Sequence, residues 1–339
     1  MGSSSGSGPS SVPSSAPGER STGPGRATTL PRTVVRHYLS VDDLSSSELL
    51  HVLDLAAKLK ADRTTFADAL AGKAIATVFE KPSTRTRVSF EVAIERLGAH
   101  PVVLSSNELQ LGRGETIEDT GRVLSRYVDA IVLRTFEQER LEVLAAASGV
   151  PVVNSLSDFE HPCQALADLL TIRERHGGLE GTVLTYLGDG NNVAHSLLLA
   201  GAKTGMIVRV ATPAGFAPIP QVVHRAAEIA AETGGSVEAG ADPEAAATGA
   251  DVLYTDVWAS MGQEDEADER ALVFRPFQLN AAIVALASPS VAVLHCLPAH
   301  RGAEITDEVI DGPASAVWDQ AENRVHTQEA LLLFLFGLG

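Results

Sequence analysis

The sequence is short of cysteine and of positive charge, and it contains no long uninterrupted apolar run. Its 339 residues include two cysteines, Cys163 and Cys296, which are too few for a disulfide framework and lack the paired spacing of metal ligands. We therefore expect a reducing, cytoplasmic setting and no metal site. The formal net charge of −17 argues against nucleic acid or an anionic membrane as a partner, because both favour a broad basic surface. No stretch approaches the apolar length that spans a bilayer, so any anion site must be local.

Residues 1–34 are also short of large apolar side chains, because Ser, Gly, Pro and Thr dominate them. Such a composition does not offset the entropy of ordering, so we expect a disordered tail. Three arginines with Glu19 as the one acid give the segment a faint similarity to an organelle transit peptide, but a tail without a targeting role is the favoured interpretation. The apolar core of a secretory signal is missing from it.

Beyond the tail, strand and helix patterns alternate, and the length favours about two domains. Residues 44–60 open with a possible capping box, Ser45 with Glu48, and continue with apolar residues at helical spacing. Short β-rich runs and helical runs then alternate in two series. The runs of the first series are 74–79, 101–106, 129–135 and 151–157 as strands, with 115–128, 138–148 and 160–178 as helices. The runs of the second series are 182–190, 206–213, 251–257 and 291–298 as strands, with 191–204, 220–233 and 277–287 as helices.

This rhythm predicts an α/β fold with two similar-sized domains, each with a mainly parallel sheet flanked by helices. We expect the first domain at 35–178, the second at 179–318, and a C-terminal helix at 319–339 that packs back on the first domain. Active sites of open α/β sheets lie at the carboxyl ends of strands, so functional residues are sought where each β run stops.

The stretch FEKPSTRTRVSF, residues 79–90, follows the first β run. Ser83 and Thr84 fall at or near the start of a helix that Arg85 and Thr86 continue. Free backbone N–H groups, hydroxyls and guanidinium groups would meet there, which is the environment that a phosphate dianion requires. A capping serine beside solvated arginines is the alternative, and it explains less well why two arginines alternate with three hydroxyls.

Two further strand ends in the first series carry polar residues. Arg134 closes the run 129–135, where a solvated strand end is the ordinary interpretation of one charge. His161 and Gln164, in HPCQ, start a helix after the next run. A neutral imidazole and a carboxamide can donate hydrogen bonds to a carbonyl oxygen as it gains negative charge, although a structural histidine is the default alternative.

In the second series, TYLGDGNNVAHS runs from a strand through glycines into a helix. Val193 occupies the final glycine position of a dinucleotide fingerprint, so a cofactor interpretation is weak. Asn191 and Asn192 instead offer amides that suit an amino-acid carboxylate. Asp256, in TDVWASMGQE, offers a carboxylate for an ammonium group.

The remaining candidates lie in two loops that follow strands. Ser260 and Met261 supply a tight polar turn. Cys296, in LHCLPAHRG, could be a nucleophile, a soft polar wall or a buried thiol, and a buried thiol is the commonest of these for a lone cysteine.

Taken in chain order, FEKPSTRTR, HPCQ, TDVWASMGQE and HCLPAHRG closely resemble the motifs of the ornithine carbamoyltransferases, within the aspartate/ornithine carbamoyltransferase family. QLGRGETIEDT and AENRVHT fit the same family, so the resemblance covers nearly everything after about residue 35. STRTR alone would indicate only the wider carbamoyltransferase group, and the Asp with Ser-Met-Gly element is what points to ornithine.

The resemblance implies a first domain that binds carbamoyl phosphate, a second that binds L-ornithine, no cofactor, and a homotrimer or a multiple of trimers with shared active sites. By matching motif, it assigns carbamoyl phosphate binding to Ser83, Thr84, Arg85, Thr86, Gln110, Arg134, His161, Pro162, Cys163, Gln164, Cys296, Leu297 and Arg324. Gln110 matches a residue that reaches into the neighbouring subunit's site. Ornithine binding falls to Asn192, Asp256, Ser260 and Met261.

The implied reaction is attack by the side-chain amine of ornithine on the carbonyl carbon of carbamoyl phosphate, which gives citrulline and phosphate. Arg85, Arg134 and His161 would stabilise the developing charge, and Cys296 would lie near the reacting nitrogen. Arginine biosynthesis is the commoner role of such enzymes. Two alternatives stay open: a carbamoyltransferase for putrescine or an N-acylated ornithine, and a dinucleotide-dependent oxidoreductase, which would leave STRTR and HPCQ unexplained. A relative that only binds ligand is disfavoured because the motif residues are present.

Overall fold

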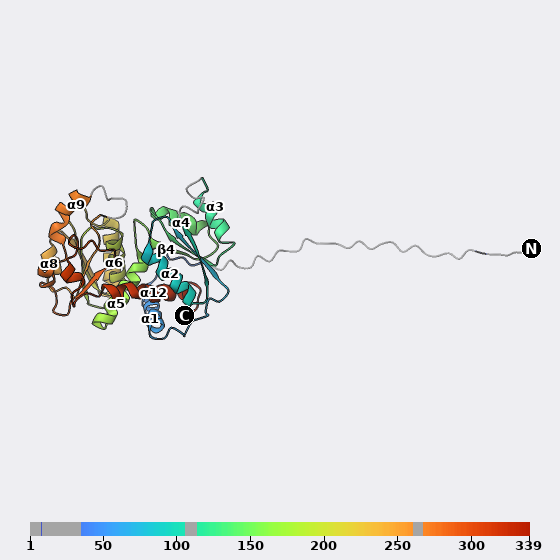
Figure 1. Cartoon of the computed structure of the whole chain (residues 1–339), viewed down its shortest axis with the longest axis horizontal. Helices are drawn as coiled ribbons and strands as arrows, with labels where there is room; N and C mark the ends of the chain where they lie inside the picture. Colours follow the sequence, from blue (N-terminus) through green and yellow to red (C-terminus); the bar gives the residue numbers. More distant parts are fainter. Residues whose placement is uncertain (1–7, 9–34, 106–113, 260–266) are drawn as a thin grey trace, which may run out of the picture. The chain divides into compact units, whose positions relative to one another are not determined.

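The computed structural model describes Gly8 and residues 35–105, 114–259 and 267–339, and the predicted tail lies outside the described residues. Residues 35–339 form one compact unit that contains two parallel β-sheets (Figure 1). The first sheet has the strand order β2-β1-β3-β4 and the second the order β7-β6-β5-β8-β9. The α/β class with two parallel sheets is therefore confirmed, whereas the domain boundaries stay a prediction.

The first sheet and its helices come from the first half of the chain. Its strands are β1 (Ala74–Phe79), β2 (His100–Ser105), β3 (Ala130–Arg134) and β4 (Val152–Leu156). The helices are α1 (Ser46–Ala61), α2 (Thr84–Arg96), α3 (Ile117–Leu124), α4 (Gln138–Ala147) and α5 (Pro162–His176), with a short 3₁₀ turn η1 (Val41–Asp43) before them. β1 and β3 pair in parallel with Phe79 opposite Arg134, so the loop after β1 and the end of β3 lie at the same edge. Sites at the carboxyl ends of these strands are thereby neighbours.

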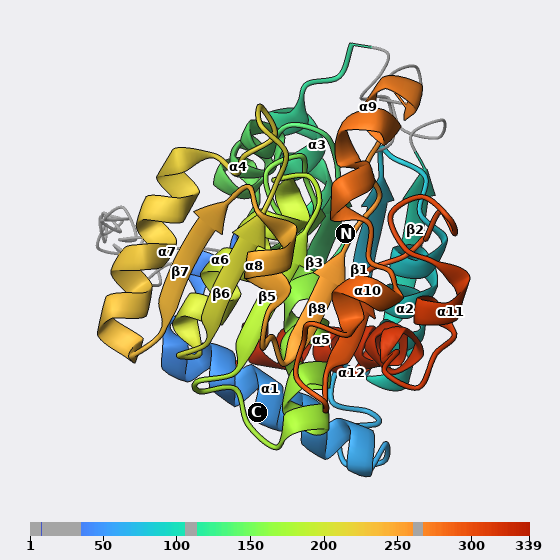
Figure 2. The same cartoon turned by 90° about the vertical axis from the view of Figure 1, so that its left-hand side faces the viewer.

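The second sheet comes from the second half of the chain, and Figure 2 shows β7, β6, β5 and β8 side by side. Its strands are β5 (Val183–Leu187), β6 (Ile207–Ala211), β7 (Ser236–Gly240), β8 (Val252–Thr255) and β9 (Ala292–His295). The helices are α6 (Asn192–Lys203), α7 (Pro220–Thr233), α8 (Pro243–Ala247), α9 (Ala267–Phe274), α10 (Ala281–Val284) and α11 (Asp307–Ile310), with a 3₁₀ turn η4 (Arg275–Phe277).

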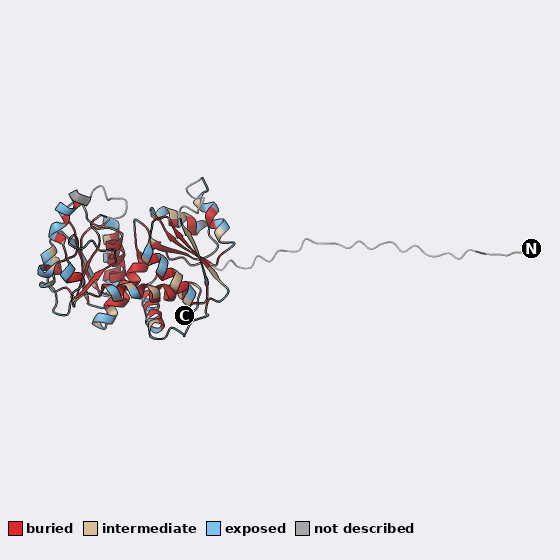
Figure 3. Cartoon of the chain, viewed as in Figure 1, coloured by how far each residue is buried: buried red, intermediate tan, exposed pale blue. Residues whose placement is uncertain are grey.

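The C-terminal helix α12 (Val317–Leu335) packs against α1, α2 and α5 and also contacts β9. Most of its residues are buried, including the polar side chains of Gln320, Asn323 and Arg324. Figure 3 shows the same burial along α5 and α6. Buried polar groups need hydrogen-bond partners, so these helices carry networks as well as apolar packing. No helix in the described ranges is long and apolar enough to cross a membrane.

Most predicted elements are confirmed, and the exceptions have local causes. The capping box forms as expected, since Ser45 and the side chain of Glu48 satisfy each other's backbone N–H groups at the start of α1. The predicted helix at 277–287 is wrong in extent, because the side chain of Asn280 caps a separate short helix, α10. β7 was not predicted, because SVEAG is largely exposed and carries almost no apolar pattern.

Candidate functional site

The loop after β1 forms the start of helix α2 as the sequence predicts. The side chain of Ser83 caps the helix, with its Oγ accepting a hydrogen bond from the backbone N–H of Thr86 at 3.3 Å. Thr84 is exposed, Arg85 is half-buried and Thr86 is buried. Arg87 instead points to solvent and pairs with Glu91 one turn along, at 2.7 Å. Residues two apart do not share a helix face, so only one arginine of STRTR faces the site.

Two distant arginines join the start of α2. Arg134, at the end of β3, donates from Nη1 to Thr86 Oγ1 at 3.5 Å, and Arg324, on α12, donates from Nη2 to the same oxygen at 2.7 Å. Both guanidinium groups are buried, with 8% and 3% of the residue exposed. The interpretation of Arg134 as a solvated charge at the end of a strand is therefore wrong. The Thr86 hydroxyl, in the first turn of α2, therefore holds two arginines together at the helix N-terminus.

The three site arginines repel one another, which marks the cluster as an anion site. Burial, together with the charges of Arg324 and Arg85, lowers the pKa of Arg134 to about 10. Burial also lowers the pKa of Arg324, and the charge of Arg85 acts in the same direction. Within the described ranges, the Nε atoms of Arg134 and Arg324 are buried without a hydrogen-bond partner. Buried donors of this kind call for an acceptor, and a phosphate oxygen relieves both the unmet hydrogen bonds and the repulsion.

His161 lies beside the same positive cluster. Its backbone N–H donates to Ser196 Oγ at 2.9 Å, and its ring is buried with no partner for Nδ1 among the described residues. Burial lowers the pKa of His161 well below its usual value, and the charges of Arg324, Arg134 and Arg85 lower it further. The imidazole is therefore neutral, as the prediction required. A neutral ring can donate one N–H toward a ligand while adding no positive charge.

The carboxamide of Gln164 has a defined orientation. Its Nε2 donates to Asp168 Oδ1 at 2.8 Å, and its Oε1 accepts from Arg324 Nη1 at 3.0 Å. A carboxylate accepts and a guanidinium donates, so the two ends of the amide cannot be exchanged. We expected Gln164 to donate to a carbonyl oxygen, and this geometry favours the opposite role, in which its oxygen faces the arginine cluster.

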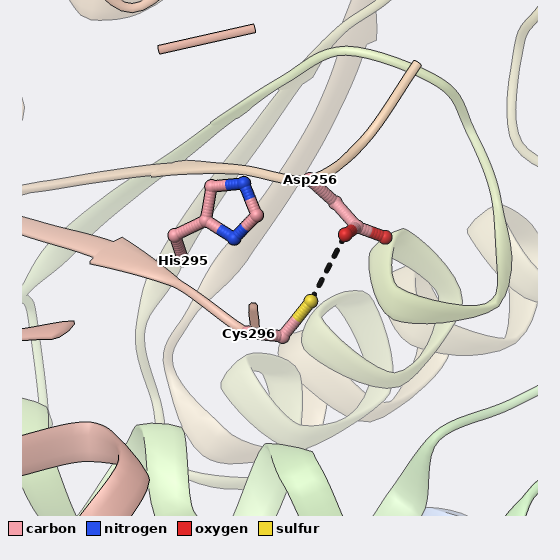
Figure 4. Close-up of side chains that lie close together, drawn as sticks. All are labelled: Asp256, His295 and Cys296. Carbon is pink, nitrogen blue, oxygen red and sulfur yellow. Dashed lines mark hydrogen bonds between the residues drawn. The ribbon is translucent and has the colours of Figure 1, made fainter. Parts of the chain in front are cut away.

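Cys296 and Asp256 meet at the ends of β9 and β8, where their side chains point toward each other (Figure 4). The thiol donates to Asp256 Oδ1 at 3.0 Å, and Asn191 Nδ2 donates to Asp256 Oδ2 at 3.0 Å. Burial raises the pKa of Cys296 well above its usual value, and the carboxylate of Asp256 raises it further. The thiol stays protonated, so Cys296 suits a role as a hydrogen-bond donor that lines the site rather than a role as a nucleophile. Burial lowers the pKa of Arg85, and the charge of Asp256 acts in the opposite direction, so Arg85 lies near this pair as well as in the anion site.

His295 completes a group of metal-ligand types with Asp256 and Cys296, whose ligand atoms lie within 4.8 Å of one another. However, His295 Nδ1 accepts from the backbone N–H of Leu297 at 2.9 Å, and Nε2 contacts Glu304 Oε1 at 3.1 Å. Both ring nitrogens are therefore used to hold the loop after β9. A cation would have to break one of these bonds, so the donor set fits a structural histidine better than a metal ligand.

The GDGNN stretch serves the fold rather than a dinucleotide. A Cβ on Gly190 would lie 2.2 Å from the backbone nitrogen of Pro218, so a neighbouring loop occupies the space beside this glycine. Asn191 caps α6 by accepting from the N–H groups of Val193 and Ala194. Asn192 donates to the backbone carbonyl of Ser157 at 2.6 Å, which ties α6 to the loop after β4.

The other candidate residues fall into three groups. Pro162 is the first residue of α5, and the buried thiol of Cys163 donates to the carbonyl of Asn154 at 3.3 Å, so that side chain serves packing. Leu297 is the one non-glycine residue with positive φ in the described part of the chain, at 59°, in the loop directly after Cys296. The predictions for three positions lie outside the described residues: Gln110, Ser260 and Met261.

Sequence reasoning missed several polar residues that support the site. Lys81, in the motif itself, is buried, bonds to Asp158 and stacks on the ring of Phe136 at 4.4 Å. Asp168 and Gln320 also went unnoticed. Their spacing held a signal, because each lies four residues from a site residue, Gln164 and Arg324, on the same helix face.

Comparisons with known proteins show which family this chain belongs to. Residues 36–174 match the family model described as aspartate/ornithine carbamoyltransferase, carbamoyl-P binding domain, and residues 180–335 match the Asp/Orn binding domain of the same family. The chain is 62% identical over 303 residues to an ornithine carbamoyltransferase of Parafrankia sp., covering 88% of this chain and 96% of that protein. It is 62% identical over 302 residues to that of Acidothermus cellulolyticus, covering 89% and 97%.

A solved structure is similar over the same range. The ornithine carbamoyltransferase from Pyrococcus furiosus aligns with a TM-score of 0.87 and 54% sequence identity, over 89% of this chain and 97% of that chain. Identity at this level, over both domains, shows the family as well as the fold. The chain belongs to the aspartate/ornithine carbamoyltransferase family, among its ornithine carbamoyltransferases.

Proposed function

We propose that this protein transfers the carbamoyl group of carbamoyl phosphate to the side-chain amine of L-ornithine, which gives L-citrulline and phosphate, in the direction of arginine biosynthesis. The observation that carries the proposal is the cluster of half-buried Arg85 with buried Arg134 and Arg324 at the start of α2, next to the Cys296–Asp256 pair. An anion site and an amine site thus adjoin, as a reaction between an acyl phosphate and an amine requires.

The phosphate end of carbamoyl phosphate fits the start of α2. Ser83, Thr84, Arg85 and Thr86 offer hydroxyls, backbone N–H groups and a guanidinium, and Arg134 adds a second guanidinium at Thr86. The helix N-terminus adds partial positive charge. As the bond to the leaving phosphate breaks, these groups stabilise the charge that its oxygens gain.

The carbamoyl end fits between His161 and Gln164. Neutral His161 donates an N–H to the carbonyl oxygen, which becomes negative in the tetrahedral intermediate, while Arg85 and Arg134 neutralise that charge. Gln164 Oε1 accepts a hydrogen bond from the carbamoyl nitrogen, as its orientation toward Arg324 favours. Pro162, Cys163 and Leu297 shape the surroundings of these groups through their backbones. The carbonyl carbon is thereby held with one face toward the second sheet.

The amine of ornithine must lose its proton before it attacks. From a lysine-like pKa of about 10.4, the neutral form near pH 8 costs roughly 3 kcal/mol in water, so the site has to lower this pKa. The charges of Arg85, Arg134 and Arg324 act in that direction. Cys296 lines the position of the reacting nitrogen, whereas Asp256 holds the α-amino group, together with Asn192, Ser260 and Met261 around the amino-acid end.

We further propose that the chain works in the cytoplasm as a homotrimer or a multiple of trimers, with Gln110 of one subunit at the site of the next. The free thiols of Cys163 and Cys296 suit a reducing compartment. Mixing inactive Gln110→Ala and Arg85→Ala subunits tests the shared site, because hybrid trimers regain activity at sites that carry neither substitution. A mixture without activity would contradict the sharing.

The proposed reaction is tested by measuring citrulline and phosphate release from carbamoyl phosphate with ornithine, beside aspartate, putrescine and N-acetylornithine. Equimolar citrulline and phosphate with ornithine alone is the expected result. Turnover with another amine would keep the anion site but overturn the ornithine assignment. Absence of turnover with all four acceptors would refute the transfer activity.

A further inference from the structure

Asp168 is a buried carboxyl group that the mechanism above does not use. It lies on α5, one turn after Gln164, with 1% of the residue exposed. Two carboxamides donate to the same oxygen: Gln164 Nε2 to Oδ1 at 2.8 Å and Gln320 Nε2 to Oδ1 at 2.7 Å. The other oxygen, Oδ2, meets no donor in hydrogen-bonding geometry within the part of the chain that the structure describes, although the Tyr254 hydroxyl lies near enough to the carboxyl group to act on its pKa. Such an arrangement is costly in a protein interior, so it calls for a functional reason.

The two carboxamides are oriented in only one way. Gln164 Oε1 accepts from Arg324 Nη1 at 3.0 Å, and Gln320 Oε1 accepts from the backbone N–H of His295 at 2.9 Å. Guanidinium and backbone N–H groups only donate, and a carboxyl Oδ1 that meets two amide nitrogens accepts from both. Asp168 therefore holds the nitrogen end of each glutamine, while Arg324 and the backbone N–H of His295 hold the oxygen ends.

A continuous chain of hydrogen bonds results from this arrangement. It begins at Thr86, where Arg324 donates, and passes through Gln164 to Asp168. From Asp168 it continues through Gln320 to the backbone of His295, directly before Cys296. These hydrogen bonds thus join the start of α2, which follows a strand of the first sheet, to the end of β9 in the second sheet.

We propose that Asp168 is a positioning residue for the transfer reaction: its Oδ1 holds Gln164 with its oxygen toward the carbamoyl nitrogen, and through Gln320 it holds the end of β9 that carries Cys296. This inference rests on the proposed function. The role needs an acceptor at Oδ1 and does not need a negative charge. Burial raises the pKa of Asp168 to about 7, so a proton on the carboxyl group is compatible with the same role.

The test compares three variants of the full chain. Asp168→Ala removes the acceptor. Asp168→Asn keeps an oxygen acceptor in a side chain of the same size and removes the charge. Thr171→Ala, one turn further on α5, is the matched control, because it deletes a buried hydrogen bond of 2.9 Å from Asn323 between the same two helices. If the alanine variant does not fold, Asp168→Ser replaces it in the comparison with the unsubstituted enzyme. The serine hydroxyl lies on a shorter side chain and cannot reach the amides of Gln164 and Gln320.

The readouts are kcat, KM for carbamoyl phosphate and the inhibition constant of inorganic phosphate. For Asp168→Ala we expect KM to rise and kcat to fall, with kcat/KM at least about tenfold lower, as when buried donors are left without their acceptor. Phosphate inhibition should change less than about twofold, because the groups that hold phosphate remain. Asp168→Asn and Thr171→Ala should stay within about threefold of the unsubstituted enzyme, the range of a neutral hydrogen-bond exchange.

Three results would overturn the inference. Wild-type kinetics in Asp168→Ala would remove the positioning role. An equal loss of phosphate binding would indicate general collapse of the pocket. A loss in Asp168→Asn as large as in Asp168→Ala would show that charge, and not the acceptor, is what matters. Failure of the proposed function is separate, because the unsubstituted enzyme would then produce no citrulline.

Discussion

Glu160, the residue before His161, is predicted to make the protein less stable as the pH rises. Its carboxyl group is fully buried and accepts from Ser40 Oγ at 2.5 Å, the Val41 N–H at 3.0 Å and Ser196 Oγ at 3.2 Å. Burial raises the pKa of Glu160 to about 7, from 4.5 for the free side chain, since these hydrogen bonds offset the loss of hydration only in part.

Proton linkage gives the direction and the size of this change in the free energy of unfolding. Because the folded state binds the proton more tightly than the unfolded state, the contribution to stability is fully present below about pH 4.5 and is lost as the pH rises through about 7. At 1.36 kcal/mol for each pKa unit, the free energy of unfolding should fall by about 2 to 3 kcal/mol between pH 5 and pH 8 from this group. Glu160→Gln stays neutral at both pH values, so the variant should lack this part of the pH dependence.

The assay is urea unfolding at pH 5, 6, 7 and 8 at one fixed protein concentration, with Glu160→Gln beside the unsubstituted protein. Glu48→Gln is the control, because the Arg36 side chain holds the pKa of Glu48 at about 2 and its contribution is lost only below the measured range. The difference between Glu160→Gln and the unsubstituted protein should therefore change with pH, whereas the difference for Glu48→Gln should stay constant. Parallel curves for Glu160→Gln and the unsubstituted protein would refute the reasoning.

Three further predictions concern the site and its loops. Arg85→Ala should lower kcat/KM by at least about a hundredfold with the fold retained, because a charge-stabilising group is lost, while Arg87→Ala, on the solvent side, should leave the kinetics unchanged. Asp256→Asn should speed alkylation of Cys296 by iodoacetamide at pH 8, followed by peptide mapping, because burial and then the Asp256 carboxylate raise the pKa of that thiol, and the substitution removes the second cause; an unchanged rate would contradict the effect of the carboxylate. Gly190→Ala should lower the free energy of unfolding by about 2 kcal/mol or more, because its Cβ would lie 2.2 Å from Pro218 N. Gly178→Ala, with nothing within 4 Å of the added Cβ, is its control in the same urea assay.

The sequence by itself determined most helices and strands and the strand ends at which the polar site residues lie. A capping serine, an apolar β run and a change to helical spacing involve neighbouring residues, so the strand β1 and the start of α2 at Thr84 were predictable. The same holds for Arg134, which ends a β run, and for His161, which precedes the first residue of the helix after the next run. The parallel pairing of β1 with β3 then brings the end of β1, before Ser83, close to Arg134 at the end of β3.

Tertiary structure alone decided which polar groups share the site and how they are oriented. Arg87 points to solvent and pairs with Glu91. Arg324, which the motif resemblance also assigns to the site, lies on α12 and donates a hydrogen bond to Thr86, 238 positions away in sequence. Asp168 and Gln320 meet only because α5 and α12 pack face to face. The reason is physical: capping and periodicity are fixed by adjacent residues, whereas hydrogen bonds between helices depend on their rotation and packing, which the whole core sets.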